Sequence, residues 1–141
     1  MQKLNLPEFE VKVKDQEIFC LVRRKWLALT PEEWVRQHFV NLMITNLHYP
    51  KGMMKLEHTM NYFKNVKRSD VTILSKEAGI FMLLECKAPT VKIDQKVINQ
   101  ISEYNKVLNS KYISVSNGLT HFVWEKNQDA YQQVRAFPAY Q

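Results

Sequence analysis

The sequence predicts an α/β (α+β) protein in which helices flank a mixed central sheet. Several short runs alternate hydrophobic and polar residues with a period of two, which is typical of half-buried strands. Two longer segments repeat hydrophobic residues at helical spacing, and the second of them lies between two strand-like runs, as in a crossover between parallel strands. The expected order is a hairpin, a helix, three strands, a helix and two or three strands.

Length and composition indicate one globular domain that spans 1–141. We expect a hairpin and lead-in at 1–29, a core at 30–126, and a C-terminal strand and tail at 127–141. No hydrophobic run approaches the roughly 20 residues needed to cross a bilayer, and the start lacks the hydrophobic centre of a signal peptide. A cytoplasmic protein without a membrane partner is therefore expected. The net charge of +6 is compatible with a phosphate-bearing partner, although many basic proteins bind no nucleic acid.

The N-terminal segment predicts a hairpin. Residues 8–14 alternate in period two, Asp15-Gln16 turns the chain, and 17–22 forms the second strand. The basic run 23–25 is either a solvated strand end or a phosphate contact. Cys20 lies in one of the strand-like runs, so a buried free thiol is expected there, as at Cys86.

The segment that begins at Thr30 predicts the first helix. Thr30 fits the N-cap, Pro31 the first helical position and Glu33 the third, which completes a capping box. The helix is expected to end near Leu47. Helical spacing puts Glu32 on the hydrophobic face and Glu33 on its flank, so Glu32 points inward without a structural role to explain it.

The remaining elements follow from periodicity and turn residues. Residues 53–63 predict a half-buried strand, and 64–68 a basic connector. Two hydrophobic runs, 69–74 and 80–87, predict an antiparallel hairpin. A helix is expected at 91–109, and the last strands are expected near 111–116, 120–125 and 131–137.

Three charged residues lie at one end of the expected central hairpin. Asp70 opens its first strand, and Glu85 and Lys87 close its second. Because side chains at i and i+2 face the same way, Glu85 and Lys87 project together, on the face shared by Phe81 and Leu83. The start of the first strand lies beside the end of the second, so Asp70 is expected near both.

Such a group suits a divalent metal. Two carboxylates and a neighbouring backbone carbonyl supply the oxygen ligands that Mg²⁺ prefers. The ion would lower the pKa of a bound water and stabilise a pentavalent phosphate. Lys87 would orient that water or neutralise charge on the phosphoryl oxygens. The alternative from the residues alone is a partly buried salt-bridge network that binds no metal.

Five sequence blocks in order resemble the PD-(D/E)xK nuclease superfamily, and within it the N-terminal nuclease domain of type I restriction enzyme R (motor) subunits. The signature is Asp70 followed by Glu85-x-Lys87, with Ser69 where the family usually has Pro. A lone Glu-x-Lys is a weak motif, whereas five blocks in order are fairly specific. They cover about residues 20–125 and lie at 30–37, 67–70, 85–89, Gln100-x-x-x-Tyr104-Asn105 and 116–118.

The resemblance implies a restriction-endonuclease-like fold and Mg²⁺-dependent cleavage of DNA phosphodiester bonds, with Mn²⁺ able to substitute. Asp70, Glu85 and the backbone carbonyl of Cys86 would hold the metal, and Lys87 would position or activate the water.

Other residues receive roles from the same resemblance. The first helix would add an acidic residue to the site, for which the face argument favours Glu32 over Glu33. Gln100 and Tyr104 match a Q-x-x-x-Y motif that positions the site and the DNA, although Tyr104 also fits a hydrophobic stripe of its helix. Glu57 is expected to be solvated. The candidate DNA contacts are Arg36, Lys67, Arg68 and Tyr104.

The resemblance leaves the biological role open. R subunits continue into a helicase, but this sequence has no G-x-x-x-x-G-K-[ST] phosphate loop. We expect a free-standing relative or a nuclease module whose partners are DNA and a separate helicase or restriction–modification subunit; a homodimer is compatible with the sequence. The alternatives are a DNA- or partner-binding protein that keeps the fold without turnover, and a structural protein whose charges merely pair.

Overall fold

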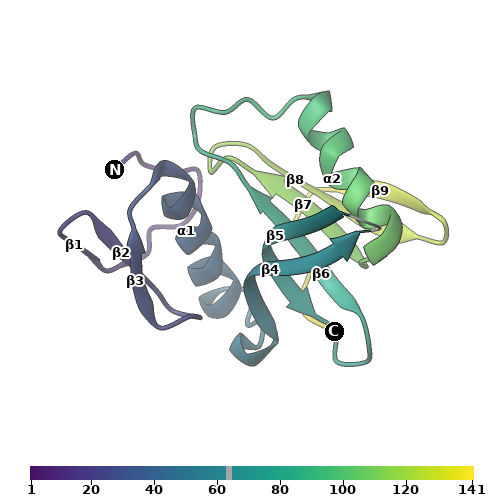
Figure 1. Cartoon of the computed structure of the whole chain (residues 1–141), viewed down its shortest axis with the longest axis horizontal. Helices are drawn as coiled ribbons and strands as arrows, with labels where there is room; N and C mark the ends of the chain where they lie inside the picture. The colour runs from purple at the N-terminus through teal and green to yellow at the C-terminus, as the bar shows by residue number, and fades with distance from the viewer. Residues whose placement is uncertain (63–64) are drawn as a thin grey trace.

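The computed structural model describes residues 1–62 and 65–141, without the side chains of residues 58–69, 104 and 107. It has three parts, which Figure 1 shows: a small N-terminal sheet, a helix α1 beside it, and a larger sheet on the other side of that helix. A second helix, α2, lies against the larger sheet. Within the described residues, no helix is long and hydrophobic enough to span a membrane.

The larger sheet has six strands arranged in sequence order. All neighbouring pairs are antiparallel except one, in which the crossover through α2 makes β6 and β7 parallel. This confirms the mixed sheet and the crossover that the sequence predicted. The strands are β4 Met54–Tyr62, β5 Asn65–Leu74, β6 Ile80–Cys86, β7 Tyr112–Ser116, β8 His121–Asn127 and β9 Ala130–Val134.

Both helices begin at a side-chain N-cap, which the sequence predicted for the first helix alone. Helix α1, Pro31–Thr45, starts where the Thr30 hydroxyl accepts a hydrogen bond from the Glu33 N–H at 3.0 Å, which is one half of the predicted capping box. The other half does not form, because the Thr30 N–H donates to the Ala28 carbonyl and the Glu33 side chain accepts a hydrogen bond from Gln37. Helix α2, Gln95–Leu108, starts where the Asp94 carboxylate accepts one from the Val97 N–H at 3.2 Å. A short 3₁₀ helix, η1 (Lys51–Met53), leads from α1 into β4.

The core has two clusters because successive strand residues face opposite sides of the sheet. The larger cluster joins α1 to the side chains of Val71, Met82, Leu84 and Cys86. The smaller one joins Leu83 and Ile113 to Leu108 of α2. The two helices therefore cover different faces of the larger sheet. Cys20 and Cys86 are both buried free thiols, as predicted.

The N-terminal sheet differs from the predicted hairpin. Its strands are β1 Val13–Lys14, β2 Glu17–Cys20 and β3 Lys25–Ala28, so it gains a third strand and loses most of the first. Alternation at 8–12 produces no strand: the Val11 N–H donates to the Phe9 carbonyl in a local turn, and Phe9 packs on the core. The alternating pattern at 8–12 therefore reflects the packing of one aromatic residue and not the pairing of a strand.

Two further predictions need correction. The basic connector expected at 64–68 belongs to β5 from Asn65 onward, where it pairs with β4 in a long two-stranded ribbon. Phe81 does not share the environment of Leu83, because the β5–β6 register shifts between Ile73 and Leu74. The shift brings Phe81 into the larger cluster, beside Met82.

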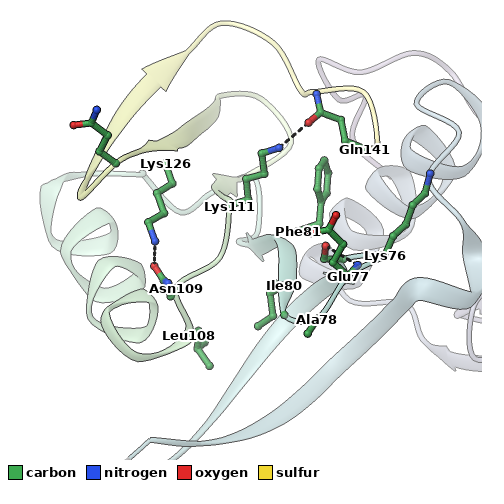
Figure 2. Close-up of a pocket in the computed structure, with 13 residues that line it drawn as sticks. Lys76, Glu77, Ala78, Ile80, Phe81, Leu108, Asn109, Lys111, Lys126 and Gln141 are labelled. Atoms are coloured by element: carbon green, nitrogen blue, oxygen red, sulfur yellow. Dashed lines mark hydrogen bonds between the residues drawn. The ribbon is translucent and has the colours of Figure 1, made fainter.

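A pocket of about 670 Å³ lies at the turn between β5 and β6 (Figure 2). Its lining includes Lys76, Lys111 and Lys126, together with the last residue, Gln141. This is the end of the hairpin opposite Asp70. The pocket is therefore separate from the charged group that the sequence singled out.

Candidate active site

Asp70 lies next to the end of β6, as the antiparallel hairpin predicted. The register pairs Val71 with Leu84, which puts Asp70 across from Glu85. The Asp70 carboxylate is buried, and its Oδ2 accepts a hydrogen bond from the backbone N–H of Cys86 at 2.7 Å. The orientation of this carboxylate is therefore set by the backbone of the neighbouring strand.

Glu85 and Lys87 project from the same side and form an ion pair, with Lys87 Nζ 3.1 Å from Glu85 Oε1. Burial and the negative charge of Glu85 raise the pKa of Asp70 to about 7. Burial opposes protonation of Lys87, but the charges of Glu85, Asp70 and Glu32 outweigh it and raise the pKa of the amine. At neutral pH, Lys87 is accordingly a cation beside the carboxyl groups of Asp70 and Glu85.

This donor set fits a hard divalent cation that keeps most of its own water. Asp70, Glu85 and the backbone carbonyl of Cys86 are oxygen ligands, and Mg²⁺ is usually held by only one or two carboxylates, waters and substrate phosphate. Among the described residues, no group of three or more His, Cys, Asp or Glu side chains is placed to hold a metal. The site thus suits an ion completed by water and a phosphate rather than an all-protein cage.

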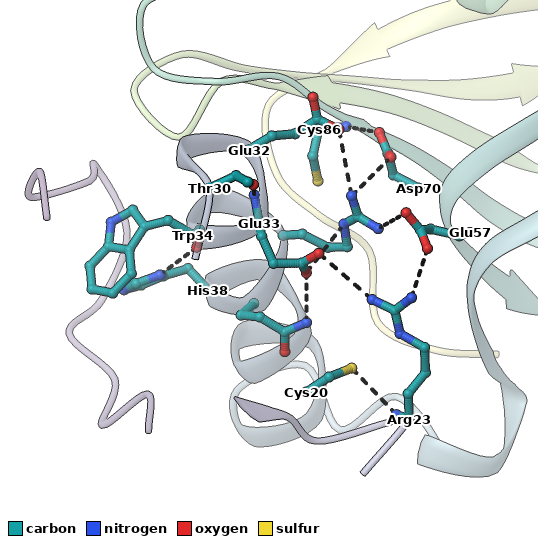
Figure 3. Close-up of polar contacts among 12 residues, drawn as sticks. Cys20, Arg23, Thr30, Glu32, Glu33, Trp34, His38, Glu57, Asp70 and Cys86 are labelled. Carbon is teal, nitrogen blue, oxygen red and sulfur yellow. Dashed lines mark hydrogen bonds and ion pairs between the residues drawn. The ribbon is translucent and has the colours of Figure 1, made fainter. Parts of the chain in front are cut away.

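Arg36 lies next to this group and is surrounded by four carboxylates, which Figure 3 labels. Its guanidinium nitrogens lie 3.5 Å from Glu32 Oε1, 3.5 Å from Glu33 Oε2, 3.1 Å from Glu57 Oε1 and 3.5 Å from Asp70 Oδ1. Its side chain is only 5% exposed. We predicted a DNA contact for Arg36, but burial among four carboxylates leaves almost no surface for a phosphate and makes it an internal counter-ion.

A second arginine, Arg23, extends the network to the N-terminal sheet. Arg23 Nη1 lies 2.7 Å from Glu57 Oε2, and Nη2 lies 3.7 Å from Glu33 Oε1. Glu57, which we expected to be solvated, therefore bridges both arginines. Burial raises the pKa of Glu57, but the two guanidinium groups outweigh this effect and lower it. The sequence offered Arg23 only as a strand end or phosphate contact, and nothing in its spacing pointed to Glu57.

The positions of Glu32 and Glu33 reverse the face argument. The Glu33 side chain is 9% exposed and accepts a hydrogen bond from Gln37 Nε2 at 2.9 Å, whereas the Glu32 side chain is 47% exposed. The argument failed because α1 is covered by two sheets, so its buried surface includes a polar face as well as the hydrophobic stripe. Glu32 nevertheless lies near the site, because the Arg36 nitrogen that contacts it also contacts Asp70. Burial and the charge of Asp70 raise the pKa of Glu32.

The other expected site residues are placed less closely. Gln100 is exposed on α2, and among the described residues it makes no hydrogen bond to Asp70, Glu85 or Lys87. The side chains of Lys67, Arg68 and Tyr104 lie outside the described residues. Their predicted DNA contacts stay predictions.

The block 116–118 has a structural role, which its side-chain hydrogen bonds show. The Asn117 side-chain oxygen accepts hydrogen bonds from the N–H groups of Leu119 and Thr120 at 2.9 and 2.8 Å. Its amide donates to the Val91 carbonyl at 2.8 Å, which ties down the segment that follows Lys87. An asparagine suits this place because it both closes the turn and reaches across to the neighbouring loop.

Comparison with known proteins shows the family of the chain. The family model described as the type I restriction enzyme R protein N terminus matches residues 31–138. No curated protein matches the chain. The matched region contains Asp70, Glu85 and Lys87, while Arg23 and the N-terminal sheet precede it. Since the match covers most of its length, the chain belongs to the family of type I restriction enzyme R protein N termini.

Proposed function

We propose that this protein is a Mg²⁺-dependent endonuclease domain that hydrolyses DNA phosphodiester bonds. The observation that carries the proposal is the group at the end of the β5–β6 hairpin: Asp70 across from Glu85, with Lys87 3.1 Å from Glu85. Its occurrence in a restriction-enzyme family makes DNA the expected substrate. The formal charge of +6 agrees with a polyanionic substrate.

Asp70, Glu85 and the backbone carbonyl of Cys86 would hold Mg²⁺, for which Mn²⁺ can substitute. The ion, when bound, supplies Lewis-acid stabilisation of the phosphoryl group and an acidified water. Lys87 is protonated and would neutralise charge that develops on the phosphoryl oxygens. Glu32, half-exposed beside Asp70, would be the acidic residue that α1 adds, with Gln100 in the positioning role that the resemblance gives it.

The wider setting belongs to the same proposal. The protein would act in the cytoplasm on DNA, with Lys67, Arg68 and Tyr104 as contacts to it. It would work with a helicase or restriction–modification subunit, and a homodimer is part of the same proposal.

One contact favours a second candidate, a DNA- or partner-binding protein that does not cleave. The Arg36 guanidinium lies 3.5 Å from Asp70 Oδ1 and partly neutralises a carboxylate that the metal needs. If this neutralisation persisted, the fold would bind DNA without turnover. Metal titration separates the two candidates, since only the nuclease requires Mn²⁺ binding that depends on Asp70.

The deciding experiment is plasmid nicking with Mg²⁺ or Mn²⁺ by the wild type, Lys87→Ala and Asp70→Ala. We expect nicking by the wild type and a loss of at least about 100-fold in both variants, since Asp70→Ala removes a metal ligand and Lys87→Ala removes the cation that neutralises charge on the phosphoryl oxygens. The matched control is Lys111→Ala, an exposed lysine at the far pocket, which should nick like the wild type. Equal activity in all four proteins would refute the nuclease assignment of this site.

A further inference from the structure

We infer that Glu57 and Arg23 are positioning residues of the metal centre, which they serve by holding the Arg36 guanidinium away from full pairing with Asp70. This inference rests on the proposed function, because it concerns the same carboxylate. It adds two residues that neither the sequence motifs nor the family match singles out. One of them, Arg23, lies outside the matched range of 31–138.

Glu57 is the partner that holds Arg36 most closely. Its two oxygens are divided between the arginines, with Oε1 3.1 Å from Arg36 Nη1 and Oε2 2.7 Å from Arg23 Nη1. The other carboxylates near Arg36, including Asp70, lie at 3.5 Å. Since ion-pair energy falls with distance, the guanidinium is drawn mainly toward Glu57. Figure 3 shows the Glu57 carboxylate facing the Arg23 guanidinium.

The backbone at Glu57 is built for this contact. Its φ of +53° lies in the left-handed region, which a residue with a Cβ adopts only at a cost of about 1 kcal/mol or more. The β4–β5 ladder pairs Leu56 with Val71 and resumes at His58 with Ser69. Glu57 and Asp70 are the two positions between these pairs. The register therefore puts the carboxylate that holds Arg36 at the level of Asp70.

Arg23 gives Glu57 a fixed position. It reaches from the turn between β2 and β3, where its N–H donates to Cys20 Sγ at 3.3 Å. Its guanidinium contacts both Glu57 and Glu33, the two carboxylates that pull Arg36 away from Asp70. Through this residue the N-terminal sheet contributes to the geometry of the active centre.

Removing the charge of Glu57 should release Arg36 toward its remaining carboxylates. The guanidinium would then pair more fully with Asp70, and a divalent cation would have to compete with it. Metal affinity should fall although no metal ligand has changed. The effect should vanish when Arg36 is also replaced, because no guanidinium is then left to compete.

The test is calorimetric titration of Mn²⁺ into full-length Glu57→Gln, Arg23→Met and Arg23→Lys, with melting curves to confirm folding. We expect about tenfold weaker binding in Glu57→Gln and Arg23→Met, equivalent to about 1.4 kcal/mol. Arg23→Lys keeps the charge and should bind nearly as the wild type does. Glu103→Gln, which breaks an exposed ion pair with Lys106, is the matched control and should leave affinity unchanged.

The double variant Glu57→Gln/Arg36→Gln tests the mechanism, and it should recover at least the wild-type affinity. Should the wild type bind Mn²⁺ through Asp70 while Glu57→Gln and Arg23→Met bind it equally well, the positioning role is wrong and the proposed function stands. If Asp70→Asn binds Mn²⁺ with the same affinity as the wild type, both the proposed function and this inference are overturned. If Glu57→Gln does not fold, the comparison of Arg23→Met with Arg23→Lys decides.

Discussion

The two ends of the β5–β6 hairpin carry charged side chains in opposite environments. At one end, Asp70, Arg36 and Glu33 are buried and interlocked. At the other end, the exposed Lys111 amine donates to the Gln141 side-chain oxygen at 2.6 Å. Nearby, the Lys76 amine lies 5.3 Å from the centre of the Tyr140 ring. The hairpin thus has a buried ionic network at one end and exposed, loosely paired charges at the other.

This difference in burial indicates which end of the hairpin lowers the stability of the fold. Taking charges out of water costs several kcal/mol per ion unless partners compensate, whereas exposed charges cost little and contribute little. Two like charges held together, as at Asp70 and Glu85, have no benefit for folding alone. This unfavourable pair at the Asp70 end of the hairpin is therefore a physical reason to place the active site there. The pocket at the opposite end holds no such pair of carboxylates among its described lining residues.

The largest expected effect is on stability at the buried end. Arg36→Met should destabilise the protein by about 3–5 kcal/mol, because four carboxylates lose their shared counter-ion. Lys111→Met, at the exposed end, should change stability by less than about 0.5 kcal/mol. Urea unfolding followed by circular dichroism measures both. Similar urea midpoints for the two variants would show that Arg36 does not stabilise the folded protein as the counter-ion of these carboxylates.

Replacing Asp70 should have a smaller effect on the free energy of unfolding, and it should stabilise the protein instead of destabilising it. Its pKa is raised from the ordinary 3.8 to about 7, first by burial and then by Glu85. Between these values the folded state binds a proton that the unfolded state lacks, so this group makes the metal-free protein less stable as pH rises through that range. Asp70→Asn removes the titrating group and leaves an oxygen for the Cys86 N–H.

We therefore expect metal-free Asp70→Asn at pH 8 to be more stable than the wild type, by on the order of 2 kcal/mol. The two should converge near pH 4. Thermal melting in the presence of a chelator, across this pH range, is the measurement, with the exposed Asp129→Asn as control. A variant that is less stable at pH 8 would mean that the Arg36 contact outweighs the repulsion from Glu85.

The fold and the central triad could be predicted because both depend on local periodicity. Strand alternation puts Glu85 and Lys87 on one side, and hairpin geometry alone brings Asp70 to them. The crossover helix likewise follows from the order of elements. These features require no knowledge of how distant segments pack.

The ionic network could not be predicted for the opposite reason. Arg23, Glu33 and Glu57 meet because β2 packs against α1 and the turn between β2 and β3 carries Arg23 to the two carboxylates. A face count assumes that one side of a helix is buried, and this helix lies between two sheets. The left-handed backbone at Glu57 has no sequence signal either, since the residue is neither Gly nor Asn.

The smallest effect tests whether the two ends are independent. The Tyr140 hydroxyl donates to the Leu74 carbonyl at 2.8 Å, and its ring packs on Phe81 with centroids 5.0 Å apart. Tyr140→Phe keeps the ring and removes one hydrogen bond, so we expect a loss of about 1 kcal/mol in unfolding free energy. Nicking should be unchanged, because Leu74 lies at the far end of β5 from Asp70. A loss of nicking at full folding would show that register at the turn is transmitted along the hairpin to the carboxylates, and the two ends would then have to be treated as one unit.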